Sequence, residues 1–208
     1  MTEYSDEFPA PLLSARRLTF RRGEERIFGP LEFDLEAGGV LVIEGGNGAG
    51  KTSLLRVLAG LLAASENSDE GGEPEVRVNH SVALLGHSLG LTGELDAVEN
   101  LRFAAGLQGN GGGMTPHNAL RGVGLEGYED IPVGRLSAGQ RKRVALARLL
   151  VAPAAIWLLD EPYANLDPEG IALVNRLIER HTHAGGGVTL TSHGAQLPLK
   201  QAATVVRL

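Results

Sequence analysis

The residues with the clearest chemical potential form a glycine-rich stretch that fits the pattern G-x-x-x-x-G-K-T, from Gly45 to Thr52. In this pattern glycines let backbone N–H groups approach phosphate oxygens, the lysine neutralises the β- and γ-phosphates, and the threonine hydroxyl can bind Mg²⁺. We therefore predict a nucleotide site here. The residues expected to bind the nucleotide are Gly45, Asn47, Gly48, Ala49, Gly50, Lys51, Thr52 and Ser53.

The elements around this stretch have to position it. The apolar run 40–43 is typical of a strand buried on both faces of a parallel sheet. A helix is predicted over 51–59, because Leu54, Leu55 and Leu58 share one face, and Gly60 fits its end. A chance match is the alternative in a chain with 29 glycines. Strand, glycine loop and helix together favour a true phosphate loop.

Two acidic residues follow another apolar run, 156–159. Asp160 is expected at the carboxyl end of a parallel strand, where ligands bind in such sheets. We expect it to hold Mg²⁺, and we expect Glu161 to face the water that attacks the γ-phosphate.

The segment from Leu136 to Gln140 has two readings. Ser137 and Gln140 fit a capping box at the start of a helix that runs through Val151. A capped helix N-terminus with a glycine is also an anion site. The same residues can therefore begin a helix and meet a γ-phosphate.

His193 follows the predicted strand 188–191, so we expect it in the same ligand crevice as Glu161. The other histidines considered lack such a context. His181 and His183 are two residues apart on a predicted helix and cannot share a face as metal ligands.

Composition restricts the functional classes. The chain has 208 residues, 43% hydrophobic and 21% charged, which suits one globular domain. Its net charge of -6 argues against nucleic acid as a main partner, and we read the basic cluster 141–143 as a solvated helix face. The absence of cysteine excludes disulfides and thiolate metal sites. Residues 1–11 do not resemble a secretory signal, and the uncharged apolar stretch 149–159 is too short to span a membrane.

The pattern along the chain is α/β. Further strands are predicted at 31–35 and 82–85, and a helix is predicted to begin at Asp167-Pro168, with Ile171, Val174 and Ile178 on one face. Residues 65–74 read as a surface loop and 109–113 as a flexible turn. The region from about 89 to 150 reads as mainly helical.

With these motifs in this order, the chain resembles the ATP-binding subunits of ABC transporters from about Leu18 to the C-terminus. The resemblance implies a P-loop NTPase core of ABC type, with a mainly parallel sheet flanked by helices and an antiparallel β portion. It also implies an inserted helical lobe. We expect a single domain over 1–208, with the core at about 12–87 and 152–208 and the lobe at about 88–151.

The resemblance also implies roles and cofactors. ATP and Mg²⁺ are the expected cofactors, and two copies are expected to form a homodimer on binding ATP. Lys51, Glu161 and His193 match catalytic positions, and Thr52 and Asp160 match metal-binding positions. Residues that match the signature, which contacts the other protomer's ATP, are Ser137, Ala138, Gly139 and Gln140. Those that match the dimer-interface loop are Asn165 and Asp167.

Within that superfamily the chain is similar to the CcmA family, the ATPases of the cytochrome c maturation (haem export) system. The stretches that carry this similarity are 84–87, 99–103, 127–133 and 136–149. They imply integral-membrane partners of the CcmB type, a role in haem delivery, and a place at the cytoplasmic face of the inner membrane.

Two positions depart from the general ABC pattern. His87 stands where most such ATPases have a glutamine, and it is a candidate to bind Mg²⁺ or order the water. Arg22 precedes Gly23 where an aromatic residue usually stacks on adenine. Its guanidinium plane offers a substitute stacking surface.

Other functions stay open at this stage. The shared ABC motifs also fit a transporter ATPase for a different substrate. A soluble ABC ATPase usually has a coiled-coil insertion or two modules, which this chain lacks, and the signature argues against a phosphate-loop kinase or GTPase. The apolar stretch 89–101 is either lobe core or a groove for a membrane subunit.

Overall fold

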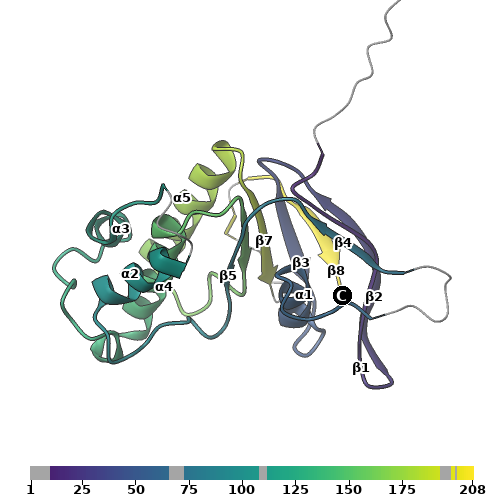
Figure 1. The fold of residues 1–208 in the computed structure, drawn as a ribbon, viewed down its shortest axis with the longest axis horizontal. Helices are drawn as coiled ribbons and strands as arrows, with labels where there is room; N and C mark the ends of the chain where they lie inside the picture. Colours follow the sequence, from purple (N-terminus) through teal and green to yellow (C-terminus); the bar gives the residue numbers. More distant parts are fainter. Residues whose placement is uncertain (1–9, 66–72, 108–111, 193–197, 200) are drawn as a thin grey trace, which may run out of the picture.

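Two β-sheets form the framework of the computed structural model, which describes residues 10–65, 73–107, 112–192, 198–199 and 201–208 (Figure 1). The first sheet is antiparallel, with strand order β2-β1-β4. Its strands are β1 (Leu13–Arg22), β2 (Glu25–Leu35) and β4 (Glu75–Val78). The second sheet is parallel, with strand order β5-β6-β7-β3-β8. Its strands are β3 (Val40–Glu44), β5 (Val82–Leu85), β6 (Ile156–Leu159), β7 (Gly187–Ser192) and β8 (Thr204–Arg207).

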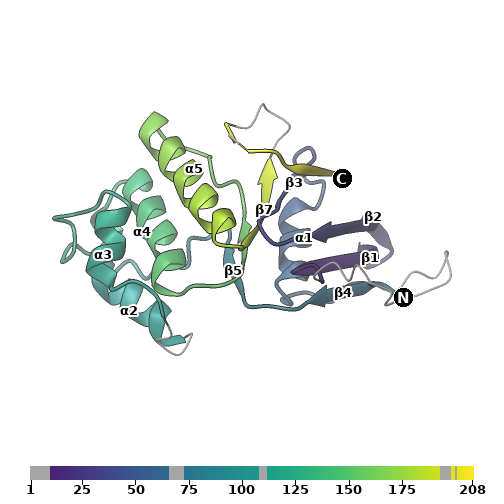
Figure 2. The same ribbon diagram turned by 90° about the horizontal axis from the view of Figure 1, so that it is seen from above.

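The helices fall into two groups, as Figures 1 and 2 both show. Beside the sheets lie α1 (Lys51–Leu58), next to β3, and α5 (Pro168–His183), which precedes β7. At the far end lie α2 (Ala97–Leu107), α3 (Pro116–Gly122) and α4 (Ala138–Val151), which pack on one another. A short 3-10 helix, Val133–Arg135, precedes α4. The described residues between 89 and 150 contain helices and no strand, as predicted.

The parallel sheet separates two apolar clusters. On one face, Leu41, Ile43, Ile156 and Leu158 pack with α1 and the antiparallel sheet. On the other face, their neighbours along β3 and β6 pack with α2, α3, α4 and α5; these are Val40, Val42, Trp157 and Leu159. Because successive side chains of a strand point to opposite faces, a continuous apolar run is what a sheet covered on both sides requires.

The sequence-predicted elements are confirmed where the structure describes them. The predicted strands at 31–35, 40–43, 82–85, 156–159 and 188–191 all lie within observed strands. The helices predicted at Lys51 and Pro168 begin there, and the Asp167 side chain accepts a hydrogen bond from the Gly170 N–H. The predicted loop 65–74 and turn 109–113 fall largely outside the described residues.

The antiparallel sheet also fixes the position of the phosphate loop. Gly50, just before α1, has φ 97. A Cβ atom there would lie 2.6 Å from Ile27 Cγ2 and 2.9 Å from Phe28 Cδ1, both on β2. Only glycine allows this close approach. Among the described residues, no helix is long and apolar enough to cross a membrane.

A histidine packs against the tryptophan of β6. The His181 ring stacks on Trp157, with ring centroids 3.9 Å apart and planes 7° apart. His181 Nε2 lies 3.2 Å from the Ala155 carbonyl oxygen. Burial lowers the pKa of His181, although hydrogen bonds to the backbone at Ala155 and Gly187 oppose the shift. This side chain therefore belongs to the core, not to a metal site.

We predict that this stack makes stability depend on pH. The pKa of His181 is lower in the folded chain than in the unfolded chain. As the pH falls, His181 of the unfolded chain therefore binds a proton before His181 of the folded chain does. Stability is thus full above the unperturbed pKa of about 6.5 and falls as the pH drops below it. Urea unfolding of His181→Phe should show a weaker loss between pH 7.5 and 5.5 than wild type. His183→Gln, on the same helix but exposed, is the control; an equal acid loss in wild type and His181→Phe would contradict the prediction.

Candidate functional site

The glycine-rich loop connects β3 to α1 and wraps around the Lys51 side chain. Lys51 is buried, and its Nζ donates hydrogen bonds to the carbonyl oxygens of Gly45 at 2.7 Å and Gly46 at 2.9 Å. A Cβ atom at Gly46 or Gly48 would meet no atom within 4 Å, so the outer side of the loop is open. The first N–H groups of any α-helix point out of its N-terminus, which makes the start of α1 suited to an anion.

Asp160 links the loop to the parallel sheet. Its carboxylate is buried, with 4% of the residue exposed. Oδ2 accepts a hydrogen bond from Thr52 Oγ1 at 2.8 Å, and Oδ1 accepts one from Thr191 Oγ1 at 2.8 Å. Its backbone N–H donates to the Leu85 carbonyl at 2.8 Å. One side chain therefore joins the start of α1 to the ends of β6 and β7.

Glu161 has an unusual backbone. Its φ is 47, a left-handed value that is uncommon for residues other than glycine. Its N–H donates to Thr191 Oγ1 at 2.9 Å, and its carbonyl oxygen accepts from Lys142 Nζ at 3.1 Å. Such conformations persist where their surroundings fix them, and they gather at functional sites.

Two cavities meet at Glu161. One is lined by the phosphate loop from Asn47 to Ser53, by Glu161, and by Arg22 and Ile27 of the antiparallel sheet. The other is lined by Glu161 and by His87, Leu89, Ala138, Arg141, Lys142, Asp160, Ala164 and Asn165. The structure thus places Arg22 beside the loop, and it places His87 in the same cavity as the two acidic residues.

Lys142 lines the second cavity together with these acidic groups. Burial lowers the pKa of its ammonium group, and the charges of Asp160 and Glu161 act in the opposite direction. Its contact with the Glu161 backbone places α4 directly against the site.

The segment 137–140 begins α4, and both halves of its capping box are present. Gln140 N–H donates to Ser137 Oγ at 3.2 Å, and Ser137 N–H donates to Gln140 Oε1 at 2.9 Å. Ser137 and Ala138 are exposed. Ser137, Gly139 and Gln140 line a third cavity together with Asn165 and Asp167. The predicted signature and the predicted interface loop are therefore neighbours.

The structure brings most of the predicted residues together in one region and leaves one of them untested. The phosphate loop, Asp160, Glu161, Arg22 and His87 line two adjoining cavities. His193 lies outside the described residues. Sequence reasoning missed Thr191, Lys142 and Arg143 as parts of the site. Thr191 ends a buried strand beside the predicted crevice, a signal available in the sequence, whereas the two cations looked like a solvated helix face.

A cation fits the chemistry at Asp160. Among the described residues, the two groups that donate hydrogen bonds to this buried carboxylate are neutral hydroxyls, so they offset its charge only in part. The Thr52 hydroxyl and the Asp160 carboxylate are oxygen donors, which Mg²⁺ prefers. In the described ranges no three His, Cys, Asp or Glu side chains gather as a metal cage. Mg²⁺ is usually held by one or two carboxylates together with substrate phosphates.

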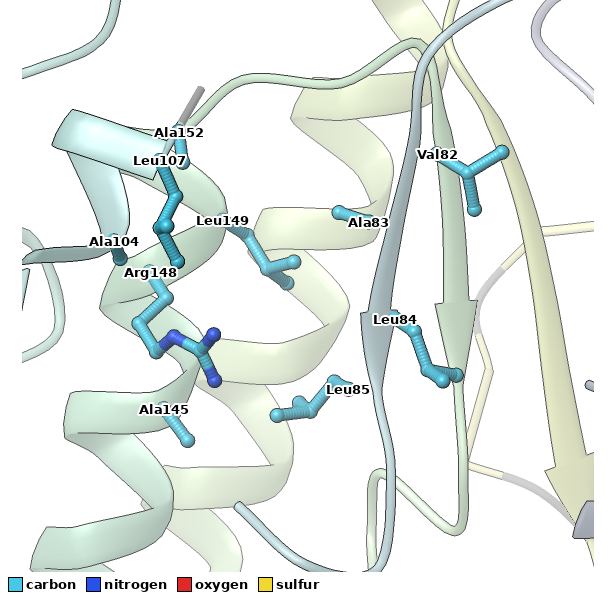
Figure 3. A pocket seen from close by; sticks show the side chains of 10 residues that line it. All are labelled: Val82, Ala83, Leu84, Leu85, Ala104, Leu107, Ala145, Arg148, Leu149 and Ala152. Carbon is cyan, nitrogen blue, oxygen red and sulfur yellow. The ribbon is translucent and has the colours of Figure 1, made fainter. Parts of the chain in front are cut away.

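An apolar groove lies apart from these cavities, between the edge strand β5 and the helices α2 and α4 (Figure 3). Its lining residues are Val82, Ala83, Leu84, Leu85, Ala104, Leu107, Ala145, Arg148, Leu149 and Ala152. On α2, Leu107 is 70% exposed and Phe103 is 65% exposed. In the stretch considered as a groove from the sequence, Val98 and Leu101 are buried in the core, and Leu89 and Leu91 pack against it. None of the residues that line the groove falls within that stretch.

Comparisons with known proteins agree with this arrangement. The family described as ABC transporter matches residues 28–164. A cytochrome c biogenesis ATP-binding export protein CcmA from Xanthomonas campestris pv. campestris is 55% identical over 188 residues, covering 89% of this chain and 88% of the relative. The protein of the same name from Alcanivorax borkumensis is 42% identical over 190 residues, covering 91% and 86%.

Solved structures are similar in fold. The ATP binding subunit of an ABC transporter superposes with a TM-score of 0.76 over 88% of this chain and 80% of that chain, at 22% identity. At this identity the likeness shows the fold alone. It agrees with the predicted core of parallel and antiparallel sheets with a group of helices.

Proposed function

Because the chain belongs to the ABC transporter family of ATP-binding proteins, we propose that it drives a membrane complex in cytochrome c biogenesis by hydrolysing ATP. The observation that carries this proposal is Asp160, buried between the hydroxyls of Thr52 and Thr191 beside an open phosphate loop. The loop, the carboxylate and the adjoining Glu161 together suit ATP hydrolysis. The shared name of the relatives points to the process that the hydrolysis serves.

In the proposed site each residue of the loop acts on a defined part of the nucleotide. The backbone N–H groups of Asn47, Gly48, Ala49 and Gly50 and of the start of α1 bind phosphate oxygens. Lys51 neutralises the β- and γ-phosphates. Ser53, which follows Thr52, also binds the nucleotide. Arg22 and Ile27 line the same cavity and form the wall for the adenine base, with the Arg22 guanidinium plane stacking on it.

Hydrolysis needs a bound cation and an oriented water molecule. Mg²⁺, when bound, neutralises charge on the phosphates, and Thr52 and Asp160 are the residues that would hold it. Glu161 orients the attacking water and accepts its proton. Because Thr191 holds both Asp160 and the Glu161 N–H, the two carboxylates keep a fixed relative position. His87 and His193 complete the proposed site, His87 through the metal or the water and His193 through the γ-phosphate.

Proteins of this family work as pairs together with membrane-embedded partners. In the proposed dimer, Ser137, Ala138, Gly139 and Gln140 face the ATP held by the other copy. Asn165 and Asp167 lie beside them and cross the interface. Exposure of Ser137 and Ala138 at the start of α4 supports this assignment, because a buried signature could not meet another chain.

We propose that the groove beside β5 binds a short helix of an integral-membrane subunit of the CcmB type. Its apolar lining and the exposed Phe103 and Leu107 fit an amphipathic helix. Such a partner would hold the chain at the cytoplasmic face of the inner membrane. The proposed cargo is haem, because cytochrome c carries haem attached to its own cysteines.

The first prediction concerns dimer closure. Glu161→Gln should bind MgATP without turning it over, and should accumulate a closed dimer, because the amide cannot accept the proton from water. Light scattering should report a doubled mass on adding MgATP and a monomer without it. ATP turnover should fall by a factor of about 100 or more, in the range typical of losing a general base.

The matched control is the double variant Lys51→Ala, Glu161→Gln. Without the Lys51 ammonium the phosphates bind weakly, so ATP should leave this double variant monomeric at the same protein concentration. A monomer for Glu161→Gln itself, with MgATP bound, would contradict the proposed closure. Wild-type turnover in the single variant Lys51→Ala would contradict the phosphate-loop assignment.

The second prediction concerns the membrane partner. The chain has no cysteine, so a single cysteine at Leu107 or Phe103 gives a clean cross-linking site. We expect each to label an integral-membrane subunit when the complex is isolated from membranes, because both side chains are exposed on α2 and Leu107 lines the groove.

The control cysteine replaces Leu61, which is 64% exposed and follows α1, away from the groove. It should give no cross-link to the same subunit. Recovery of the intact complex with labelling from Leu61→Cys but from neither groove site would place the interface elsewhere. Mass spectrometry of the labelled subunit identifies the partner directly.

A further inference from the structure

Helix α4 carries two adjacent cations that hold the segment following β6. Lys142 contacts the start of this segment at Glu161, and Arg143 contacts its end at Asp167 and Glu169. The sequence alone suggested a solvated patch at 141–143. The structure instead shows Lys142 and Arg143 partly buried and bonded to other elements.

The contact of Lys142 falls on the strained residue of the site. Lys142 Nζ donates to the Glu161 carbonyl oxygen at 3.1 Å, and the Ala164 N–H donates to the same oxygen at 3.1 Å. The Glu161 N–H is held by Thr191. Both backbone polar groups of a residue with φ 47 are therefore fixed from outside. A left-handed non-glycine residue needs such support to keep its conformation.

Arg143 fixes the other end of the segment. Its Nη2 lies 3.6 Å from Asp167 Oδ1, the atom that caps α5, and 3.9 Å from Glu169 Oε2. Its Nη1 donates to the Val123 carbonyl oxygen at 3.1 Å. The segment between Glu161 and Asp167 is thus held at both ends by neighbouring residues of one helix.

Helix α4 runs without a break from the signature residues past Lys142. Its N-terminus is closed by the capping box, and Val144, Ala145, Leu146 and Ala147 are fully buried. Lys142 follows Gln140 by two residues and lies about one turn after Ala138. A displacement of the exposed first turn must therefore carry Lys142 with it.

We propose that Lys142 is a positioning residue that ties the placement of Glu161 to the signature end of α4 in the same chain. This inference rests on the proposed function, since it gives Glu161 a role in hydrolysis. When the signature residues bind the other copy's nucleotide, α4 shifts. The hydrogen bond from Lys142 then holds the Glu161 backbone in the position in which its carboxylate can act on the water. Lys142 itself does not touch the nucleotide, so it governs the rate and not the affinity.

The test compares Lys142→Met with Lys142→Arg in the full chain. In Lys142→Met the donor is lost and kcat should fall by about 10- to 100-fold, the range expected for one charged hydrogen bond. The Kd for MgATP, measured with a fluorescent ATP analogue, should stay within about twofold. Lys142→Arg keeps a cationic donor and should recover most of the rate. Lys142→Gln, with a neutral N–H donor, should fall between them and replaces Lys142→Met if that variant does not fold.

The control is Arg176→Met, which removes an exposed cation from α5 and should leave kcat unchanged. Unchanged kcat in Lys142→Met would overturn the proposal. So would a parallel loss of ATP affinity, which would make Lys142 a nucleotide ligand, or an equal loss in Lys142→Arg. If wild type itself hydrolyses no ATP, the proposed function fails. If wild type is active and Lys142→Met matches it, only the positioning role fails.

Discussion

The site depends on one buried carboxylate. Asp160 accepts hydrogen bonds from Thr52 at the start of α1 and from Thr191 on β7, each at 2.8 Å. A carboxylate with 4% exposure is costly unless hydrogen bonds and a cation offset its charge. The same arrangement that makes burial costly in the free chain suits the binding of Mg²⁺ with a nucleotide. The phosphate loop, the strand ends and the acidic pair are therefore fixed relative to one another before ATP arrives.

Two parts of the fold around Asp160 have different proposed roles: the parallel sheet with α1, and helix α4. The parallel sheet and α1 hold the groups proposed to act on the nucleotide of the same chain. The first turn of helix α4 is exposed to solvent. Lys142 of the same helix donates a hydrogen bond to the Glu161 carbonyl oxygen. The groove lined by α2, α4 and β5 shares this helix with the site. One helix thus touches the proposed partner surface, the proposed dimer surface and the acidic residues, so movement at one can reach the others.

Much of this arrangement is predictable from the sequence, and the exceptions have physical reasons. Apolar runs such as 40–43 and 156–159 predicted their strands because both faces of the parallel sheet are covered. The capping box at Ser137 and the start of α5 at Pro168 are local patterns, and both are confirmed. Lys142 and Arg143 were misread as a solvated face because their partners lie 19 or more residues away in the chain. The stretch 89–101 was left open between lobe core and groove, because its apolar residues do not show which of them are buried; the structure places Val98 and Leu101 in the core.

The central claim is that each ATP site is shared between two copies of the chain. It is tested most directly by mixing two inactive variants, Lys51→Ala, which lacks the phosphate-loop cation, and Gly139→Asp, which places a carboxylate in the signature. A mixed dimer keeps one intact site, made from the phosphate loop of one copy and the signature of the other. Neither variant should turn over ATP alone, so mixing them at equal concentrations should restore turnover well above the sum of the two separate rates. No recovery, with mixed dimers demonstrated by differential tags, would contradict the shared site.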